Sequence, residues 1–170
     1  MIADKIADWL AEKGIEHAFG IVGAGNVVLF DAISRKAKTQ IVCCHHEQAA
    51  VLAAGFYYRT SNRLAVALVT TGAGQANAIT GVISCWMDST PVLILSGNEP
   101  SKYMGAQTRV LGVQGFDIVR MMRNHTKYAM RPRTWSETER ALQDGYSEAL
   151  RPRQGPAWID LSRDLVCLNP

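Results

Sequence analysis

The sequence predicts a three-layer α/β/α fold, in which helices cover both faces of a sheet of about six mainly parallel strands. Short apolar runs alternate along the chain with helical patterns, which is typical of consecutive βαβ units. The run at residues 64–70 is apolar almost throughout, as expected of a parallel strand buried on both faces. Two of the runs lead into Gly-Ala-Gly, at residues 23–25 and 72–74, where a strand turns sharply into a helix.

Each element follows from a local pattern. The first helix places Ile2, Ile6 and Leu10 on one face and ends near Gly14. In chain order, helices are predicted at residues 2–13, 26–34, 47–59, 75–87, 116–123 and 136–150. Strands are predicted at residues 17–22, 40–44, 64–70, 91–96, 127–130 and 157–161. The last helix is expected to begin with the capping box Ser136-x-x-Glu139, and residues 97–114 are expected to be irregular.

The composition is that of a folded domain. The 170 residues are 48% hydrophobic and 19% charged, which excludes intrinsic disorder and predicts a single domain over residues 1–170. A net charge of +3 does not favour a nucleic-acid partner, and no apolar stretch is long enough for a membrane span. The sequence contains no Cys-x-x-Cys pair. We therefore expect free, mostly buried thiols in a reducing, cytoplasmic compartment at Cys43, Cys44, Cys85 and Cys167.

Unusual residues follow three of the predicted strands. In open α/β sheets, ligands bind beyond the carboxyl ends of the strands. Residues 22–26 and 70–77 are glycine-rich turns, whose backbone N–H groups can approach a ligand, and residues 45–48 read His-His-Glu-Gln. A fourth polar segment, residues 109–114, lies in the irregular stretch. The sequence predicts that a ligand site is built from these segments.

The glycine turns alone leave two other interpretations open. Gly23-x-Gly25 after a strand also fits the start of a dinucleotide-binding fingerprint, with Glu47 near the place of a ribose-binding acid. Against this, Val28 occupies the third glycine position, and Glu47 opens a helix instead of ending a strand. The glycines are also explained as tight turns without a ligand.

Glu47 and its two preceding histidines have structural explanations as well. A carboxylate in the first turn of a helix is stabilised by the helix dipole. His45 and His46 have no further His or Cys at ligand spacing, so no metal site is predicted. We expect the histidine pair to orient or shield Glu47.

Taken together, five segments resemble a known family. These are FGIVGAG, HHEQAAVLAAGFYYR, LVTTGAGQANAITGV, MDSTPVLILSG and GPAWIDLSRDL, in this order along the chain. They resemble the N-terminal pyrimidine-binding (PYR) domain of thiamine diphosphate enzymes, and most closely the acetolactate synthase-like branch. The resemblance runs along nearly the whole chain.

The resemblance implies roles for individual residues. Glu47 corresponds to the catalytic glutamate that hydrogen-bonds N1′ of the cofactor's aminopyrimidine and relays the proton for deprotonation of the thiazolium C2. The activated cofactor attacks a 2-keto acid and accepts the electrons of decarboxylation, with or without carboligation. Gln114 corresponds to a catalytic glutamine at the reaction centre, and His46 and Arg109 are candidate substrate contacts. The implied cofactor-binding residues are Val22, Gly23, Gly25, Glu47, Thr71, Gly72, Ala73, Gly74 and Asn77.

Three positions depart from the family pattern. Ala73 stands where close relatives often have proline, and Val22 replaces a frequent proline or serine. Gly115 follows Gln114 where relatives usually have an acidic residue, which speaks against acetolactate chemistry in particular.

The resemblance also implies a partner. Relatives hold Mg²⁺ and the diphosphate through a Gly-Asp-Gly…Asn motif in a separate diphosphate-binding (PP) domain, and no such motif occurs here. Residues 1–170 are therefore expected to be one PYR domain, with the middle and PP domains absent, that is inactive alone. We expect a PYR homodimer, and a heterotetramer with a PP subunit that holds Mg²⁺. The candidates for these contact faces are Trp86, Met87, Met121 and Met122.

Two other functions stay open at this stage. One is a non-catalytic PYR-like interaction or regulatory module, and the other is a Rossmann-type nucleotide-binding domain.

Overall fold

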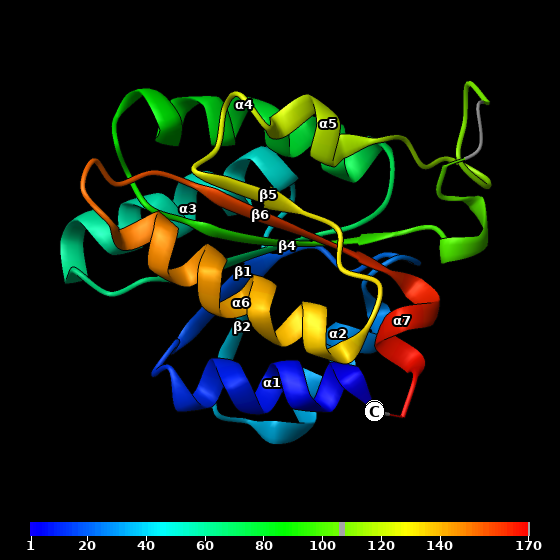
Figure 1. Cartoon of the computed structure of the whole chain (residues 1–170). Helices are drawn as coiled ribbons and strands as arrows, with labels where there is room; N and C mark the ends of the chain where they lie inside the picture. The colour runs from blue at the N-terminus through cyan, green and yellow to red at the C-terminus, as the bar shows by residue number, and fades with distance from the viewer. Residues whose placement is uncertain (106–107, 170) are drawn as a thin grey trace.

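The computed structural model describes residues 1–105 and 108–169, so residues 106 and 107 of the predicted irregular segment lie outside the described part. Figure 1 shows a central sheet between two layers of helices. All strand pairs are parallel, in the order β2-β1-β3-β4-β6-β5, which confirms the predicted three-layer fold. The strands are β1 (His17–Gly20), β2 (Gln40–Cys43), β3 (Val66–Val69), β4 (Leu93–Asn98), β5 (Tyr128–Met130) and β6 (Ala157–Ser162).

Each face of the sheet has its own layer of helices and its own apolar core. One face is covered by α1 (Ile2–Glu12), α2 (Val27–Lys36), α6 (Trp135–Leu150) and α7 (Arg163–Cys167). The other is covered by α3 (Glu47–Ser61), α4 (Ala73–Met87) and α5 (Ile118–Met122). A short 3₁₀ turn, η1 (Ser101–Tyr103), follows β4.

Strand β3 shows why the apolar run at residues 64–70 predicts burial on both faces. Successive side chains of a strand point to opposite faces. Val66 and Leu68 accordingly belong to the core beneath α1 and α2, whereas Ala67 and Val69 belong to the core beneath α3 and α4. All four are fully buried.

Several predicted boundaries were wrong by about two residues. The capping pair of α6 is Thr134 and Glu137, since Thr134 Oγ1 accepts from the Glu137 N–H at 3.2 Å, and not Ser136 and Glu139. Trp135 packs against the core, so the helix has to begin before Ser136. Strand β4 continues to Asn98, and α4 begins at Ala73, while η1 and α7 were not predicted.

The cysteines are free, as expected, but they are not mostly buried. Cys85 is buried on α4, where its Sγ lies close to Gly55 of α3, whereas Cys43 and Cys167 are exposed and Cys44 is half-buried. Cys43 is exposed because it ends β2, the strand at one edge of the sheet. Burial raises the pKa of the Cys85 thiol to about 11.

The apolar residues expected on contact faces divide into three cases. Met122 is buried in the core, so it is not a surface residue. Met121 is exposed on α5, and Trp86 and Met87 line a cavity at the end of α4. Within residues 1–105 and 108–169, no helix has the length and apolar character needed to cross a membrane.

Candidate functional site

The turns that follow β1, β3 and β4 meet at the carboxyl edge of the sheet, where β6 runs into α7 in Figure 1. The Gly25 N–H donates to Thr70 Oγ1 at 3.1 Å, and Thr71 Oγ1 donates to the Gly97 carbonyl at 3.3 Å. These bonds join the turns after β1 and β3 to the end of β4, although the three segments are far apart in the sequence. The two glycine-rich turns therefore lie against each other at this edge.

Close packing explains the glycines of the first turn. A Cβ on Gly23 would lie 2.5 Å from Thr70 Oγ1, and a Cβ on Gly25 would overlap Thr71 Oγ1 and approach the Gly97 carbonyl carbon to 3.1 Å. Any side chain here would separate the two turns. Val22, just before them, points outward and is 53% exposed.

Glu47 is a buried carboxylate at the first position of α3. Its side chain is among the buried polar groups, and the residue is 8% exposed. Its Oε2 accepts a hydrogen bond from Asn77 Nδ2 on α4 at 3.1 Å. A Cβ on Gly74 would lie 3.0 Å from Glu47 Oε1, so glycine at this position leaves room for the carboxylate. In the described part of the chain, Oε1 has no hydrogen-bond partner, so one oxygen is held and the other is available.

The histidines before Glu47 do not orient it, contrary to expectation. His46 is the N-cap of α3, and its Nδ1 accepts from the Gln48 N–H at 3.2 Å. Both His45 and His46 are exposed. The orienting hydrogen bond to Glu47 comes instead from Asn77, one turn into the neighbouring helix.

Gln114 reaches the same edge from the segment after β4. Its Nε2 donates to the Thr71 carbonyl at 3.3 Å, and its backbone N–H donates to Glu99 Oε1 at 3.3 Å. A cavity of about 200 Å³ lies beside this contact and is lined by Gly25, Thr71, Asn98, Glu99, Gln114 and Arg163, among others. Arg109 and Ala73 are both exposed. Among the described residues, no hydrogen bond joins Arg109 to this edge.

A buried polar cluster beneath the site was missed at the sequence level. Asp160 on β6 is fully buried, and four donors converge on its carboxylate. Oδ1 accepts from Gln75 Nε2 at 2.7 Å and Ser96 Oγ at 2.6 Å. Oδ2 accepts from Asn98 Nδ2 at 2.8 Å and Arg131 Nε at 2.7 Å. The signal that could have found it is an aspartate inside the apolar run of residues 157–161, because a buried charge requires a partner.

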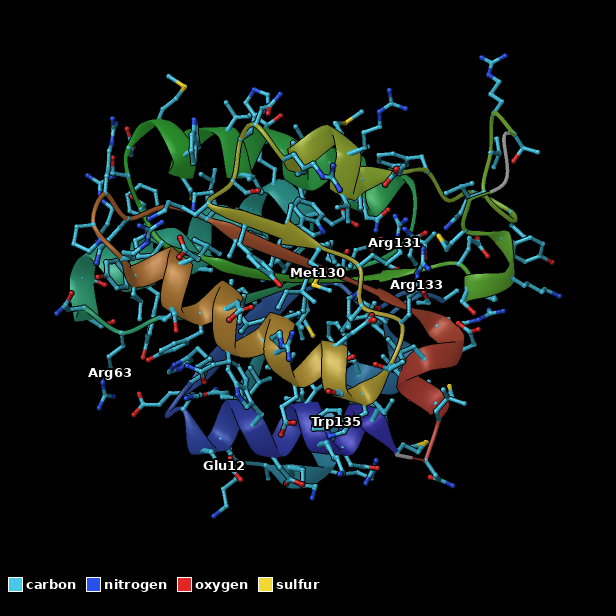
Figure 2. The ribbon with its side chains drawn as sticks, in the orientation of Figure 1. Glu12, Arg63, Met130, Arg131, Arg133 and Trp135 are labelled. Carbon is cyan, nitrogen blue, oxygen red and sulfur yellow. The ribbon has the colours of Figure 1, made fainter. Side chains whose placement is uncertain are left out.

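The Asp160 cluster supports the second glycine turn from below. Gln75 Oε1 accepts from the Gly72 N–H at 3.3 Å, so Gln75 joins the turn to Asp160. Burial raises the pKa of Asp160, and the neighbouring Arg131 guanidinium opposes this rise. Figure 2 shows Arg131 immediately after Met130, beyond the end of β5.

Replacing Gly72 by Ala is expected to destabilise the fold by about 2–4 kcal/mol, as measured by urea unfolding. Gly72 has φ +69° and ψ −113°, which L side chains rarely adopt, and its Cβ would overlap the Gln114 carbonyl oxygen. Gly14→Ala is the matched control, since Gly14 has φ +67° and open space around its Cβ position. Equal losses of stability in the two variants would show that the overlap of the new Cβ with the Gln114 carbonyl oxygen does not add to the loss.

The chain matches a known family model and several known proteins. The family model described as "Thiamine pyrophosphate enzyme, N-terminal TPP binding domain" matches residues 1–125. The acetolactate synthase large subunit of Lactococcus lactis is 33% identical over 160 residues, which is 94% of this chain and 27% of that protein. The large subunit of acetolactate synthase isozyme 3 of Escherichia coli is 31% identical over 168 residues, or 99% of this chain and 28% of that protein.

The acetolactate synthase large subunit of Haemophilus influenzae is similar to the same extent, with 30% identity over 168 residues. The chain spans 27–28% of the length of these three relatives. The similarity therefore covers nearly all of this chain and a minor part of each relative.

Proposed function

Because this chain belongs to the thiamine pyrophosphate enzyme family, through its N-terminal TPP-binding domain, we propose that it supplies the pyrimidine-binding half of a thiamine diphosphate site. The observation that carries the proposal is the state of Glu47. Its carboxylate is buried, one oxygen is held by Asn77 and the other has no partner among the described residues. This is the arrangement that a general acid–base group facing a ring nitrogen requires.

The residues around Glu47 fit a flat, nitrogen-containing ring. Gly74 leaves space directly above the free carboxylate oxygen, and the turns at residues 22–25 and 71–74 present backbone at close range. When bound, the cofactor would supply the carbon chemistry, by accepting electrons during decarboxylation of a 2-keto acid. Glu47 would hold and return a proton at the pyrimidine ring nitrogen, and Asn77 would keep the carboxylate in position.

The remaining candidates have supporting roles in this proposal. Val22, Gly23 and Gly25 would form one continuous wall of the pyrimidine site together with the adjoining turn of Thr71 through Gly74, against which the two glycines pack. Gln114 would face the substrate, because its side chain is anchored to the Thr71 carbonyl at the mouth of the site. His46 and Arg109 are exposed and would contact the substrate only in an assembled enzyme.

A second chain completes the active site in this proposal. Among the described residues, no cluster of three or more His, Cys, Asp or Glu side chains is suited to a metal ion. We therefore assign Mg²⁺ and the diphosphate to a PP-domain subunit, in a split decarboxylase or carboligase of the acetolactate synthase-like type. Two PYR chains would pair and form a heterotetramer with two such subunits. The free thiols support a reducing, cytoplasmic location.

The test is the activity of this chain purified together with its PP-domain partner. With thiamine diphosphate and Mg²⁺ added, the complex is expected to release CO₂ from at least one 2-keto acid, and the chain alone is expected to release none. A complex that is inactive on a panel of 2-keto acids, with cofactor binding verified in the same sample, would favour a non-catalytic interaction module. Binding of NAD(P) by the isolated chain would favour a Rossmann-type function.

A further inference from the structure

A second cavity lies at the opposite end of the sheet from Glu47. Figure 1 shows the end of α4 and the loop between α6 and β6 together at the amino ends of the strands, at left in the view. The cavity between them has a volume of about 560 Å³, which lies in the range of small-molecule sites. Its lining includes Trp86, Met87, Lys127, Arg151, Arg153 and Gln154. None of these residues belongs to the candidate functional site.

One side of the cavity is apolar and aromatic. Trp86 is 37% exposed and Met87 is 68% exposed, so both present apolar surface to solvent at the end of α4. A Cβ on Gly155 would lie 3.5 Å from the Trp86 ring, so the backbone packs closely behind the indole. A supported, partly exposed indole is a platform on which a planar ring can stack.

The other side carries cations whose positions are fixed by the backbone. Lys127 Nζ donates to the carbonyls of Arg151 and Arg153, at 2.7 Å each. Because an ammonium group has three N–H donors, one remains for a ligand. Arg153 is held through Nε by Ser89 Oγ and through Nη2 by the Met87 carbonyl at 3.3 Å, which leaves further guanidinium donors.

Two of the three positive charges on this side, those of Lys127 and Arg153, are not neutralised within the described residues. Arg151 is paired with Glu148, at 2.6 Å from Nη2. Lys127 and Arg153 form no ion pair with an acidic side chain in residues 1–105 and 108–169, and no acidic residue lines the cavity. Two fixed positive charges beside an apolar platform match a ligand that joins a planar ring to a doubly charged anion.

We propose that this cavity binds a nucleotide-like ligand, with a planar heterocycle on Trp86 and a phosphate monoester on Lys127 and Arg153. The phosphate bears close to two negative charges at neutral pH, which the two cations offset. The heterocycle contributes to the affinity by stacking on Trp86 and by covering the exposed side chain of Met87. The site is independent of thiamine diphosphate, because it shares no residue with the Glu47 edge.

Titration of the full chain with adenosine 5′-monophosphate tests the proposal, with tryptophan fluorescence and calorimetry as readouts. We expect saturable binding that is at least about tenfold tighter than that of adenosine or inorganic phosphate, each of which supplies only half of the contacts. Arg153→Gln and Trp86→Leu should each weaken binding by about tenfold or more, as judged by calorimetry. Arg140→Gln is the matched control, because Arg140 is an exposed residue of α6 outside the cavity. This variant loses the same charge and should bind the nucleotide as tightly as the unchanged chain does.

Three results would overturn the proposal. They are the absence of saturable binding at millimolar nucleotide, equal affinity for inorganic phosphate and the nucleotide, and unchanged affinity in a folded Arg153→Gln or Trp86→Leu variant. Circular dichroism of each variant checks that the fold is retained, and Arg153→Gln and Trp86→Leu affect different parts of the cavity. Failure of one variant to fold therefore leaves the other as a test.

Discussion

Replacing Glu47 by Gln is expected to reduce 2-keto acid turnover by the assembled enzyme by about 10²–10⁴-fold, which is the usual contribution of a general acid–base group. The amide has nearly the shape of the carboxylate and can still accept the hydrogen bond from Asn77 Nδ2. It cannot exchange a proton with a ring nitrogen near neutral pH. The measurement is kcat for CO₂ release by the complex, at saturating thiamine diphosphate and Mg²⁺.

Glu139→Gln is the matched control for this prediction. Glu139 is exposed on α6, on the other side of the sheet from α3, so the same chemical change there should leave kcat unaltered. Size-exclusion chromatography should show the same assembly for all three proteins. Full activity of the Glu47→Gln complex would contradict the proposed role and would favour an interaction module.

Replacing Asp160 by Asn is expected to lower the free energy of unfolding by about 3–5 kcal/mol, as found when one partner of a buried ion pair is removed. Asp160 is fully buried, and the Arg131 side chain is 16% exposed. The neutral amide offers only one acceptor oxygen where four donors now converge, and it leaves the guanidinium without its buried counter-charge. Urea unfolding followed by circular dichroism measures the loss.

A double variant separates two causes of the lost stability, the broken ion pair and the changed shape of the side chain. In Asp160→Asn with Arg131→Met, no buried charge remains unpaired, so part of the lost stability should return. Asp117 also contacts Arg131, at 3.3 Å, but it is half-exposed and is expected to contribute much less. A loss below about 1 kcal/mol in Asp160→Asn would mean that the Asp160 cluster is not a structural support for the Gly72 turn.

Periodicity predicts the sheet and its two helical layers, because both depend on apolar patterns that are local in the sequence. The exact ends of the elements depend on contacts that are not local. Strand β4 extends to Asn98 because its register with β6 continues to Ser162, which no pattern near residue 98 reveals. Similarly, α6 begins at Trp135 because that ring is needed in the core beneath α1.

Part of the candidate site was predictable, because several of its residues lie in short segments with a recognisable pattern. The glycine turns and Glu47 each follow a strand, and the rule for open parallel sheets places them at one edge. Gln114 lies in the irregular stretch after β4, so its place at this edge was implied only by the resemblance. Which group orients Glu47 was not predictable, since Asn77 reaches it only through the packing of α3 against α4. The Asp160 cluster joins residues from α4, β4 and β6 with Arg131, and this convergence exists only in the folded chain.

The most direct test of the proposed function is the position of the cofactor in the complex of this chain with its PP-domain partner, determined by crystallography with thiamine diphosphate and Mg²⁺ bound. We predict that a Glu47 carboxylate oxygen lies within about 2.6–3.2 Å of the pyrimidine ring nitrogen, with Asn77 still bonded to the other oxygen. A pyrimidine ring bound away from Glu47, or a complex in which this edge of the sheet is empty while the cofactor is held elsewhere, would contradict it.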